Sequence, residues 1–483
     1  MIRAALVANA LGKVLIGLAM FMLVPLVLAL ATEGDDPRPM AWSCLITAGA
    51  GFGLIARARR THAELSLREG FLVAVSVWLA TFAFGALPFW FSPSVPGYTD
   101  AFFESVSGFT TTGATILPKV EVLPPSVQLW RCGTHWFGGM GILLLVIAIL
   151  PLLGAGGMHL YRAEFSGAKS EKLKPRITET ALSLWRIYAA LTLAEYVALR
   201  LAGMDWFEAA CHTFSTLGTG GFSTRTASVA GFASPLIEYI IIVFMILAGI
   251  NFTRQYRLWV QWEPRAFFRD TEVRAFLVFI GGATALVCGW LVFASGYGLA
   301  GAFRAALFQV SSIITTTGFI TADFARWPSF AQMLLLTLMY IGGCTGSTAG
   351  GLKVARVVTL FKVIGRELRR LVTPRAVIVV RMGSHVVPEA AIQSVLSMVC
   401  LAMTVNFFAS LLLAACGLDV LSSIAAVAAC MFNVGPGLGA VGPAEHYGNL
   451  PLLAKWVLIF CMFAGRLEFY TALVLFIPGY WRK

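Results

Sequence analysis

Ser107 to Thr115 reads S-G-F-T-T-T-G-A-T, a run of small hydroxyl residues around one glycine. Similar runs recur downstream as S-T-L-G-T-G-G-F-S-T at Ser215 to Thr224, S-I-I-T-T-T-G-F-I-T at Ser312 to Thr321, and M-F-N-V-G-P-G-L-G-A-V at Met431 to Val441. The glycines taken as equivalent are Gly113, Gly221, Gly318 and Gly437. They are separated by 108, 97 and 119 residues, so each unit is larger than a solenoid module. Four such units predict a pseudo-fourfold assembly.

The glycine and threonine content of these runs suits a backbone that lines a cation path. Glycine tolerates the dihedral angles that turn carbonyl groups inward to replace the water around a cation, and threonine adds a hydroxyl with little bulk. The competing interpretation is ordinary small-residue packing between membrane helices. Four copies in matching context favour the cation path. The candidate ion-coordinating residues are Thr110, Thr111, Thr112, Gly113, Gly218, Thr219, Gly220, Gly221, Thr315, Thr316, Thr317, Gly318, Val434, Gly435, Pro436 and Gly437.

The composition identifies an integral membrane protein. Of the 483 residues, 58% are hydrophobic and 12% are charged, whereas a soluble domain has about 25% charged residues. Apolar runs near the ~20 residues that cross a bilayer recur along the whole chain. The formal charge of +12 is interpreted as basic cytoplasmic loops and not as a nucleic-acid surface.

Chemistry-bearing motifs give no support for an enzyme. The nine cysteines are scattered, mostly inside apolar runs, and form no C-x-x-C pair. The six histidines are equally dispersed, without an H-E-x-x-H pattern. The cysteines are therefore interpreted as small hydrophobic residues, and neither a zinc site nor a disulfide framework is predicted.

The chain divides into five segments. Residues 1–69 hold two transmembrane spans, Ala4 to Ala31 and Met40 to Ile55, the first of which is too long for a signal peptide. The four pore repeats are predicted at 70–180, 181–270, 271–387 and 388–483. Their long spans are predicted at Gly70–Trp90 and Val127–Leu153, Leu182–Leu201 and Ile237–Trp259, Ala275–Phe293 and Phe330–Phe361, and Pro388–Cys416 and Leu453–Phe476.

Each repeat also contains a segment too short to cross a bilayer, which predicts a re-entrant pore helix before the glycine run. These segments are Asp100–Gly108, Trp206–Leu217, Gly301–Ile313 and Leu421–Phe432. The negative end of each helix dipole would then point at the glycine run, an arrangement that favours cations. Basic stretches at Arg57–Arg68, Tyr161–Thr180 and Arg254–Arg274 are expected on the cytoplasmic side.

A glycine-rich break interrupts the last span of the third repeat. Gly342 to Gly351 reads G-G-C-T-G-S-T-A-G-G, and non-helical backbone at membrane depth persists only where it is buried in protein or lines water. A phosphate-binding P-loop is the competing interpretation, but Leu352 precedes Lys353, so the G-K-[ST] pattern is missing. The segment Lys353 to Arg381 is predicted to contact lipid, a cytoplasmic partner, or both.

Two charged residues stand inside the last predicted span. Because inserting an arginine into a membrane costs a few kcal/mol or more, Arg466 is a functional candidate. Glu468 is two positions away and so points about 200° around the helix, which disfavours a direct pair. Arg466 is predicted to face the pore, with a structural ion pair as the alternative.

With four helix, pore-helix, loop and helix repeats, a glycine-rich break and an arginine in the last helix, the chain resembles the TrkH/TrkG branch of the Trk/Ktr/HKT superfamily. The two N-terminal spans are part of that resemblance, which covers essentially the whole chain. It implies an all-α polytopic fold around a central pore in a bacterial inner membrane. It implies potassium uptake, because all four filter glycines are present.

The resemblance further implies a gate, a partner and an oligomeric state. The gate residues would be Gly342, Gly343, Gly346, Gly350, Gly351 and Arg466. The partners would be a second copy of the chain in a homodimer and a TrkA-like cytoplasmic regulator that binds nucleotides. Two departures bear on ion coordination: Pro436 at a threonine-like position, and Ala114 where later copies have Phe222 and Phe319.

Two other functional classes are alternatives to a gated pore. A secondary symporter coupling potassium to protons or sodium could use the broken helix as an ion site, but inverted repeats would be expected. The repeats here run in the same direction, which suits a pore. A polytopic membrane enzyme would need clustered His, Asp or Glu at one depth, and the sequence does not supply such a cluster.

Overall fold

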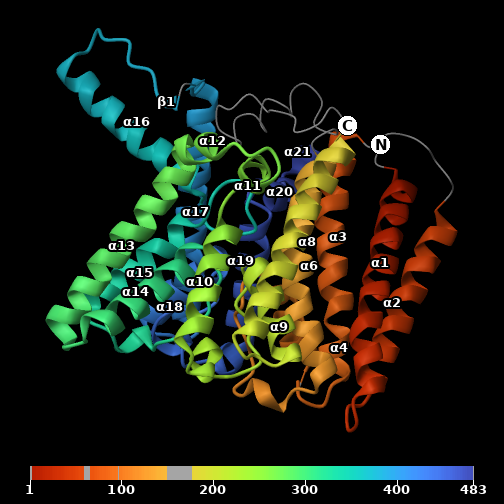
Figure 1. The fold of residues 1–483 in the computed structure, drawn as a ribbon. Helices are drawn as coiled ribbons and strands as arrows, with labels where there is room; N and C mark the ends of the chain where they lie inside the picture. The colour runs from red at the N-terminus through yellow and green to blue at the C-terminus, as the bar shows by residue number, and fades with distance from the viewer. Residues whose placement is uncertain (1–2, 59–65, 96, 150–176, 384, 482–483) are drawn as a thin grey trace.

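The computed structural model describes residues 3–58, 66–95, 97–149, 177–383 and 385–481, most of which are helical (Figure 1). Within these residues, six helices are long and apolar enough to cross a membrane, or up to eight if each of two bent pairs is one span. The predicted all-α polytopic membrane fold is confirmed.

Two antiparallel helices, α1 (Ala4–Ala31) and α2 (Arg38–Arg57), precede the repeats. They approach closely through a reciprocal pair of glycines. A Cβ added to Gly12 would lie 2.7 Å from the Gly51 carbonyl oxygen, and one added to Gly51 would lie 2.9 Å from the Gly12 oxygen. An ion pair of 2.7 Å between Arg3 and Glu69 then fastens the start of α1 to the first repeat.

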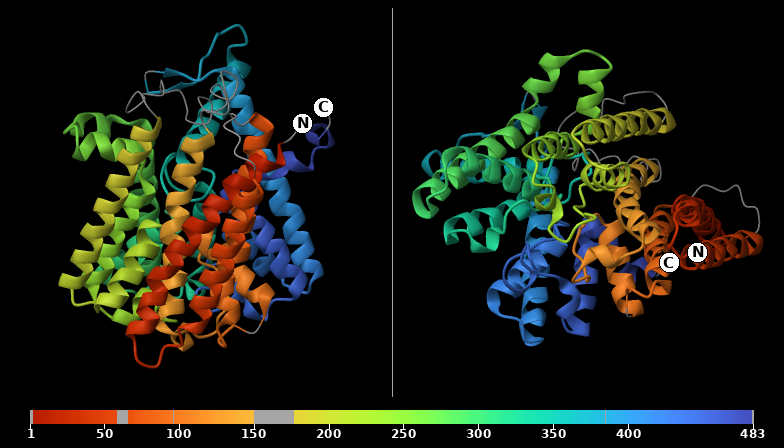
Figure 2. Two further views of the ribbon diagram at one scale, coloured as in Figure 1. Left: turned by 90° about the vertical axis from the view of Figure 1, so that its right-hand side faces the viewer. Right: turned by 60° about the horizontal axis from the view of Figure 1, so that its bottom comes forward.

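The four repeats follow one another around a common centre (Figure 2). The first contains α3 (Leu67–Gly85), α4 (Leu87–Phe91), α5 (Tyr98–Phe109), η1 (Val120–Val122) and α6 (Pro125–Ile149). The second contains α8 (Ile177–Leu201), α9 (Trp206–Leu217), η2 (Ser228–Phe232), α10 (Pro235–Gly249), α11 (Phe252–Trp259) and α12 (Pro264–Arg269).

The third and fourth repeats have the same order of long and short helices. The third contains α13 (Thr271–Ser295), α14 (Leu299–Ile314), η3 (Phe324–Arg326), α15 (Ser329–Ile341) and α16 (Val354–Val372), followed by a small antiparallel pair of strands, β1 (Arg381–Met382) and β2 (His385–Val386). The fourth contains α17 (Glu389–Ala415), α18 (Val420–Met431), η4 (Gly439–Val441), η5 (Tyr447–Asn449), α19 (Leu452–Arg466), α20 (Tyr470–Leu473), η6 (Val474–Phe476) and α21 (Pro478–Trp481).

The four short helices predicted from the sequence are confirmed as α5, α9, α14 and α18. They have 12 to 16 residues, and their last two turns are buried apart from the half-buried Phe214 of α9. Aspartate side chains begin two of them: Asp205 accepts a hydrogen bond from Phe207 N, and Asp419 accepts one from Ser422 N. These caps satisfy backbone donors that would otherwise lack partners at the helix start.

Two spans predicted as continuous are bent. The span expected at Ile237–Trp259 turns by 108° between α10 and α11, and the span expected at Leu453–Phe476 turns by 116° after α19. Asn251 makes the first bend by capping α11 through Thr253 N and Arg254 N. At the second bend Glu468 and Phe469 both have left-handed backbone, with φ of 55° and 54°, which ends the helix without a glycine.

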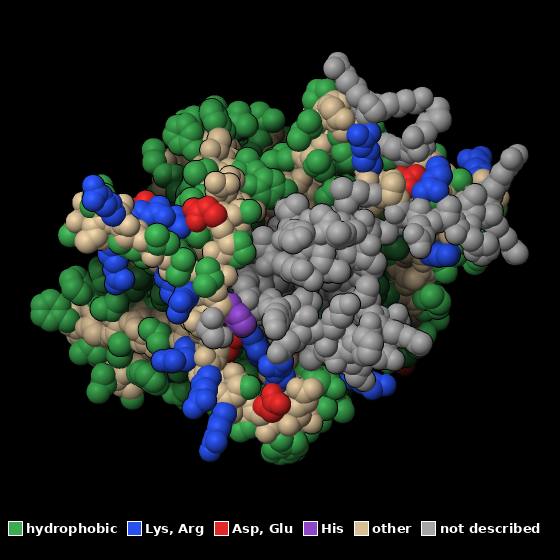
Figure 3. Space-filling view, turned by 90° about the horizontal axis from the view of Figure 1, so that it is seen from above, with side chains coloured by type: hydrophobic (Ala, Val, Ile, Leu, Met, Phe, Trp, Pro, Cys, Tyr) green, Lys and Arg blue, Asp and Glu red, His purple; other side chains and the backbone are tan. Residues whose placement is uncertain are grey.

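Basic side chains gather at the end of the bundle that carries α11, α12 and α16 (Figures 1 and 3). Arg369 and Arg370 lie there in the last turn of α16. By the positive-inside rule, we expect this end to face the cytoplasm. Most of the basic linker predicted at Tyr161–Thr180, and part of the one at Arg57–Arg68, lie outside the described residues.

Candidate functional site

Each short helix leads into a loop of the same backbone shape. A non-glycine residue with φ between 53° and 57° is followed two positions later by a glycine with φ between 77° and 96°. The pairs are Thr111 and Gly113, Thr219 and Gly221, Thr316 and Gly318, and Asn433 and Gly435. Positive φ is uncommon outside glycine, so this repeated pair identifies the structurally equivalent positions of the four loops.

One hydrogen bond fixes each loop to its short helix. The backbone N–H immediately before the glycine donates to a carbonyl five residues earlier, at 2.8 Å in every repeat. The donor and acceptor pairs are Thr112 to Ser107, Gly220 to Ser215, Thr317 to Ser312, and Val434 to Ala429. The last turn of each short helix therefore dictates where the following carbonyl groups point.

The four loops close into a ring at which no side chain fits. A Cβ added to Gly113 would lie 2.0 Å from the Gly220 oxygen, and one added to Gly221 would lie 2.0 Å from the Thr317 oxygen. The corresponding distance from Gly318 to the Val434 oxygen is 2.1 Å. A Cβ added to Gly435 would lie 2.5 Å from the Thr112 oxygen, and this fourth contact closes the circle. Each glycine thus admits the carbonyl group of the next repeat.

The alignment of the fourth loop on Gly437 is wrong by two residues. The hydrogen bonds, the φ values and the ring contacts all place Gly435 opposite the other three glycines, and Ala429, not Met431, opposite their serines. Pro436 then follows the glycine, as Ala114 does, and has no threonine-like position. The run G-P-G-L-G contains glycines two apart, so glycine spacing alone could not settle the register. Asn433, which sequence reasoning missed, carries the usable signal, because asparagine readily adopts positive φ.

The predicted threonines are buried and largely bonded within their own loops. Thr110 Oγ1 donates to the Val106 oxygen at 2.6 Å and lies 2.7 Å from Thr112 Oγ1. Thr315 repeats this pattern with Ser311 and Thr317. Thr110, Gly218 and Thr315 cap α5, α9 and α14. Asn433 links the fourth loop to the first, since its Nδ2 donates to Thr112 Oγ1 at 2.9 Å and to the Met462 oxygen at 3.1 Å.

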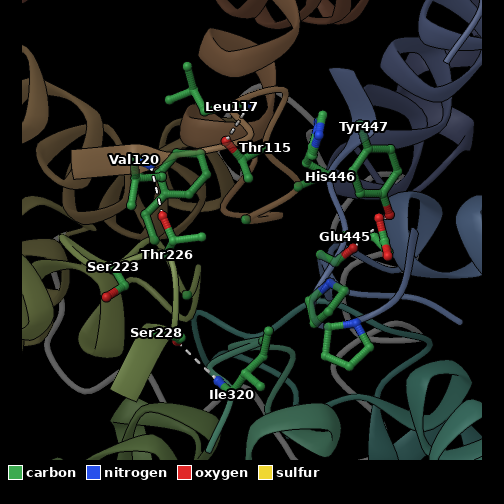
Figure 4. A pocket seen from close by; sticks show the side chains of 18 of the residues that line it. Thr115, Leu117, Val120, Ser223, Thr226, Ser228, Ile320, Glu445, His446 and Tyr447 are labelled. Carbon is green, nitrogen blue, oxygen red and sulfur yellow. Dashed lines mark hydrogen bonds between the residues drawn. The ribbon is translucent and has the colours of Figure 1, made fainter. Parts of the chain in front are cut away.

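A cavity of about 90 Å³ opens on the side of the ring away from the basic end, and all four repeats line it (Figure 4). Thr115 and Thr226 stand on one wall, Ile320 on another, and Glu445 and His446 on a third (Figure 4). The ring glycines Gly113, Gly221, Gly318 and Gly435 form part of its lining. The cavity is therefore a vestibule that leads to the ring.

On the other side of the ring lies the glycine-rich break between α15 and α16, where the helix is interrupted as predicted. Gly342 and Gly351, both at φ 77°, bring the two ends of the break together. Gly350 N donates to Thr316 Oγ1 at 2.6 Å, and Gly351 N donates to the Phe432 oxygen at 3.1 Å. Thr348 Oγ1 donates to the Leu217 oxygen at 3.0 Å. The break is thus hydrogen-bonded to the ends of three short helices or their loops.

The other two predicted gate glycines lie at the α10–α11 side of the break. A Cβ added to Gly343 would lie 3.0 Å from the Gly249 oxygen. Gly346 has φ of 74°, and a Cβ there would lie 3.0 Å from the amide of Asn251. The bend after α10 and the break in the third repeat consequently pack against each other.

Arg466, at the end of α19, is 3% exposed and binds backbone carbonyl groups. Its Nη1 donates to the Thr348 oxygen at 2.9 Å and its Nη2 to the Gly138 oxygen at 3.1 Å, while Nε has no partner among the described residues. Arg466 therefore pins the break to α6. Glu468 pairs instead with Arg356 of α16, at 2.6 Å.

A smaller cavity lies between the break and the end of α19, lined by Arg466, Glu468 and Lys353 among others. The prediction that Lys353 begins a segment in contact with lipid or a partner is wrong for this side chain, which is buried. Lys353 is 8% exposed, has φ of 77°, and its ammonium group donates to the Ala349 oxygen. Such backbone strain in a non-glycine residue is typical of functional and switching segments. Two cations and one carboxylate therefore face the space beneath the ring.

The closed ring of four repeats, with a vestibule on one side and a buried loop on the other, defines a membrane transport protein of the fourfold-pore class. Among the described residues, no group of three or more His, Cys, Asp or Glu could hold a metal ion. The chain belongs to the TrkH family of cation transport proteins, which matches residues 42–483.

The similarity to named relatives extends over nearly the whole chain. The chain is 43% identical to the Trk system potassium uptake protein TrkH of Escherichia coli K12 over 467 residues, with 96% of each chain covered. It is 40% identical to TrkH of Halomonas elongata over 480 residues, with 99% of each covered. The crystal structure of the potassium transporter TrkH from Vibrio parahaemolyticus matches with a TM-score of 0.91 at 39% identity, covering 100% of both chains. The predicted superfamily is confirmed, as is the prediction of a transport protein and not an enzyme.

We expect Asn433→Ala to destabilise the protein. It removes the buried hydrogen bonds of the Asn433 amide to Thr112, Cys430 and Met462 and leaves alanine at positive φ, a combined cost of roughly 2–3 kcal/mol. Thermal unfolding in detergent should shift down by several degrees. The matched control is Asn406→Ala, because Asn406 is also buried but its Nδ2 has no partner among the described residues. Equal shifts in the two variants would contradict the role given to Asn433.

Proposed function

We propose that this chain is the membrane subunit of a potassium-uptake system and that K⁺ crosses through the ring of four loops. The observation that carries the proposal is the closed ring, in which the carbonyl groups of Thr112, Gly220, Thr317 and Val434 each fill the space left by a neighbouring glycine. Rings of backbone carbonyl groups replace the hydration shell of K⁺ in selective pores. The names of the relatives, all potassium uptake or transport proteins, support the same substrate.

The coordinating set we propose follows the corrected register. It consists of the carbonyl groups of the two residues before each ring glycine, which in the fourth loop are Asn433 and Val434. The carbonyl groups of Gly435 and Pro436, which the alignment on Gly437 would place in this set, come two residues later in the loop, and the Gly435 oxygen accepts a hydrogen bond from the Tyr447 hydroxyl at 2.7 Å. The division into an N-terminal pair of spans and four repeats at 70–180, 181–270, 271–387 and 388–483 is part of this proposal.

We expect Gly113→Ser and Gly435→Ser to lower potassium selectivity, because a Cβ at either site would collide with a ring carbonyl. The potassium-to-sodium permeability ratio in proteoliposomes should fall roughly tenfold, which corresponds to about 1.4 kcal/mol. Gly437→Ala is the control: its Cβ would lie 2.8 Å from Val441 Cγ2 and 3.2 Å from the Ala425 backbone, not against a ring carbonyl, so the ratio should stay within twofold. If Gly437→Ala lowers the ratio and Gly435→Ser does not, the corrected register is wrong. A flux that requires a proton or sodium gradient would assign the chain to the symporter class.

We propose that the break at 342–351 and Arg466 form the gate on the cytoplasmic side of the ring. The support is geometric. The break is hydrogen-bonded to the short helices or their loops of the second, third and fourth repeats, and Arg466 joins it to α6 of the first repeat. A guanidinium about 6 Å from a passing K⁺ would repel it by roughly 3 kcal/mol at an effective dielectric constant near 20. Glycine-rich backbone can adopt a second conformation at little steric cost.

Replacing Arg466 by alanine should raise the basal flux of K⁺ or Rb⁺ several-fold, because it removes both the charge and the two hydrogen bonds that hold the break. Arg466→Lys keeps the charge and should give an intermediate flux. Tracer uptake into proteoliposomes measures the effect, with thermal unfolding as the check on folding. Well-folded Arg466→Ala protein whose flux equals that of the parent would rule out the barrier.

We propose two protein partners on the basic end. Helix α16 carries an exposed apolar stripe of Phe361, Ile364, Leu368 and Leu371 at helical spacing, on the face opposite its buried residues. Because a twofold interface buries the same apolar patch on both copies, this stripe suits a second copy of the chain in a homodimer. The neighbouring basic surface suits a TrkA-like nucleotide-binding regulator, and the membrane would be a bacterial inner membrane.

Oxidation should cross-link two copies of an Ile364→Cys variant, made in a Cys400→Ser background because Cys400 is exposed. The control is Arg369→Cys, which is exposed on the same helix but off the stripe. A dimer band in native membranes for the first variant and a much weaker one for the second is the expected result. Equal or absent cross-linking in both would favour lipid on this stripe.

A further inference from the structure

A buried ion pair lies behind the ring, between the first short helix and the helix that follows it. Arg131 of α6 donates from Nε to Glu104 Oε1 of α5 at 2.6 Å. The side chains are 2% and 0% exposed. A buried ion pair contributes little to stability compared with apolar residues of the same size, because both charges lose their hydration. We therefore look for the role of this pair in the loop atoms that the two side chains hold in place, and not in stability.

Glu104 fastens the chain as it leaves the first ring loop. Its Oε1 accepts a hydrogen bond from Thr115 Oγ1 at 2.9 Å, and its Oε2 accepts one from Ile116 N at 3.0 Å. Thr115 and Ile116 come two and three residues after Gly113. Both carboxylate oxygens of Glu104 therefore hold the residues by which the chain leaves this loop.

Arg131 fastens the second ring loop at the equivalent place. Its Nη1 donates to the Ser223 oxygen at 3.0 Å, two residues after Gly221. Its guanidinium group lies over the Phe222 ring, 3.6 Å from the centroid, and the same ring stacks on His135 with centroids 4.1 Å apart. A planar guanidinium can bind a carboxylate, a carbonyl group and an aromatic face at once, whereas a lysine cannot.

We infer that Glu104 and Arg131 form a brace that positions the first and second ring loops and so helps set ion discrimination. The two side chains are positioning residues, since their contacts are with loop residues beyond the ring glycines. The inference rests on the proposed function, because it assigns the selective step to the ring. If the brace were removed, the ring carbonyl groups of the first and second repeats would shift. The loops of the third and fourth repeats do not contact the brace and would keep their positions.

The same short helix supplies a matched control. Asp100, in the first turn of α5, pairs with Lys455 of α19 at 2.6 Å, and the two side chains are 20% and 9% exposed. This pair joins repeats one and four at the opposite end of α5 from the ring loop. It shares the chemistry and the helix of the brace but holds the other end of the helix.

The test compares the double variants Glu104→Gln/Arg131→Met and Asp100→Asn/Lys455→Met. Neither leaves an unpaired buried charge, and methionine keeps the length of the stem and the contact with Phe222. The potassium-to-sodium permeability ratio in proteoliposomes should fall at least about fivefold in the first, within the range by which residues of one network are coupled. It should stay within twofold of the parent in the second. A ratio does not depend on the amount of active protein, so loss of folded material alone would not move it.

Arg131→Lys provides a second route if the double variant folds poorly. It keeps the charge opposite Glu104 but loses the fork that reaches the Ser223 oxygen, and its ratio should also fall. Parental ratios in Arg131→Lys and in the brace double variant would overturn the inference, as would an equal fall in the Asp100 and Lys455 control. A parent protein without potassium-selective flux would instead contradict the proposed function.

Discussion

The structure depends on one steric constraint, the approach of a carbonyl oxygen to an α-carbon that carries no side chain. At each of four places in the ring, an added Cβ would lie 2.0 to 2.5 Å from the oxygen of the next repeat. Contacts this short leave no room for alanine, so the glycines are required by their neighbours and not only by their own dihedral angles. The ring can close only if all four loops present the same shape at the same depth.

The surrounding elements supply that common shape. Each short helix ends in buried residues, so its last turn is fixed by packing, and one hydrogen bond of 2.8 Å carries that position into the loop. Beneath the ring, the glycine-rich break bonds to Thr316, Leu217 and Phe432, and Arg466 adds Gly138. A movement of this single segment is therefore linked to every repeat, which is the arrangement expected of an element that acts on the whole ring.

The sequence predicted the class of fold, the four short helices, the break and most ring residues, because these depend on local signals. Segment length separates a crossing helix from a re-entrant one, and glycine clusters mark irregular backbone. The register of the fourth loop was wrong because G-P-G-L-G offers glycines at 435, 437 and 439; the backbone of Asn433 and the contact of Gly435 with Thr112 select the first. The bends at Asn251 and Glu468 were missed, since neither contains a glycine or proline at the turn. The ion pair of Arg131 and Glu104 joins residues 27 apart through tertiary packing, for which periodicity gives no signal.

The four loops belong to one polypeptide, and this changes how the ring can vary. In a ring of four identical chains every substitution appears four times at once, so small costs are multiplied and most changes are lost. Here a substitution enters one quadrant only, and the sequences of the other three loops stay unchanged. Asn433 in place of threonine, and Ala114 and Pro436 in place of phenylalanine, are departures of this kind. Because the four loops lie in one chain, the quadrants of the ring can differ: one is held by the ion pair of Glu104 and Arg131, and one is joined to its neighbour by the amide of Asn433.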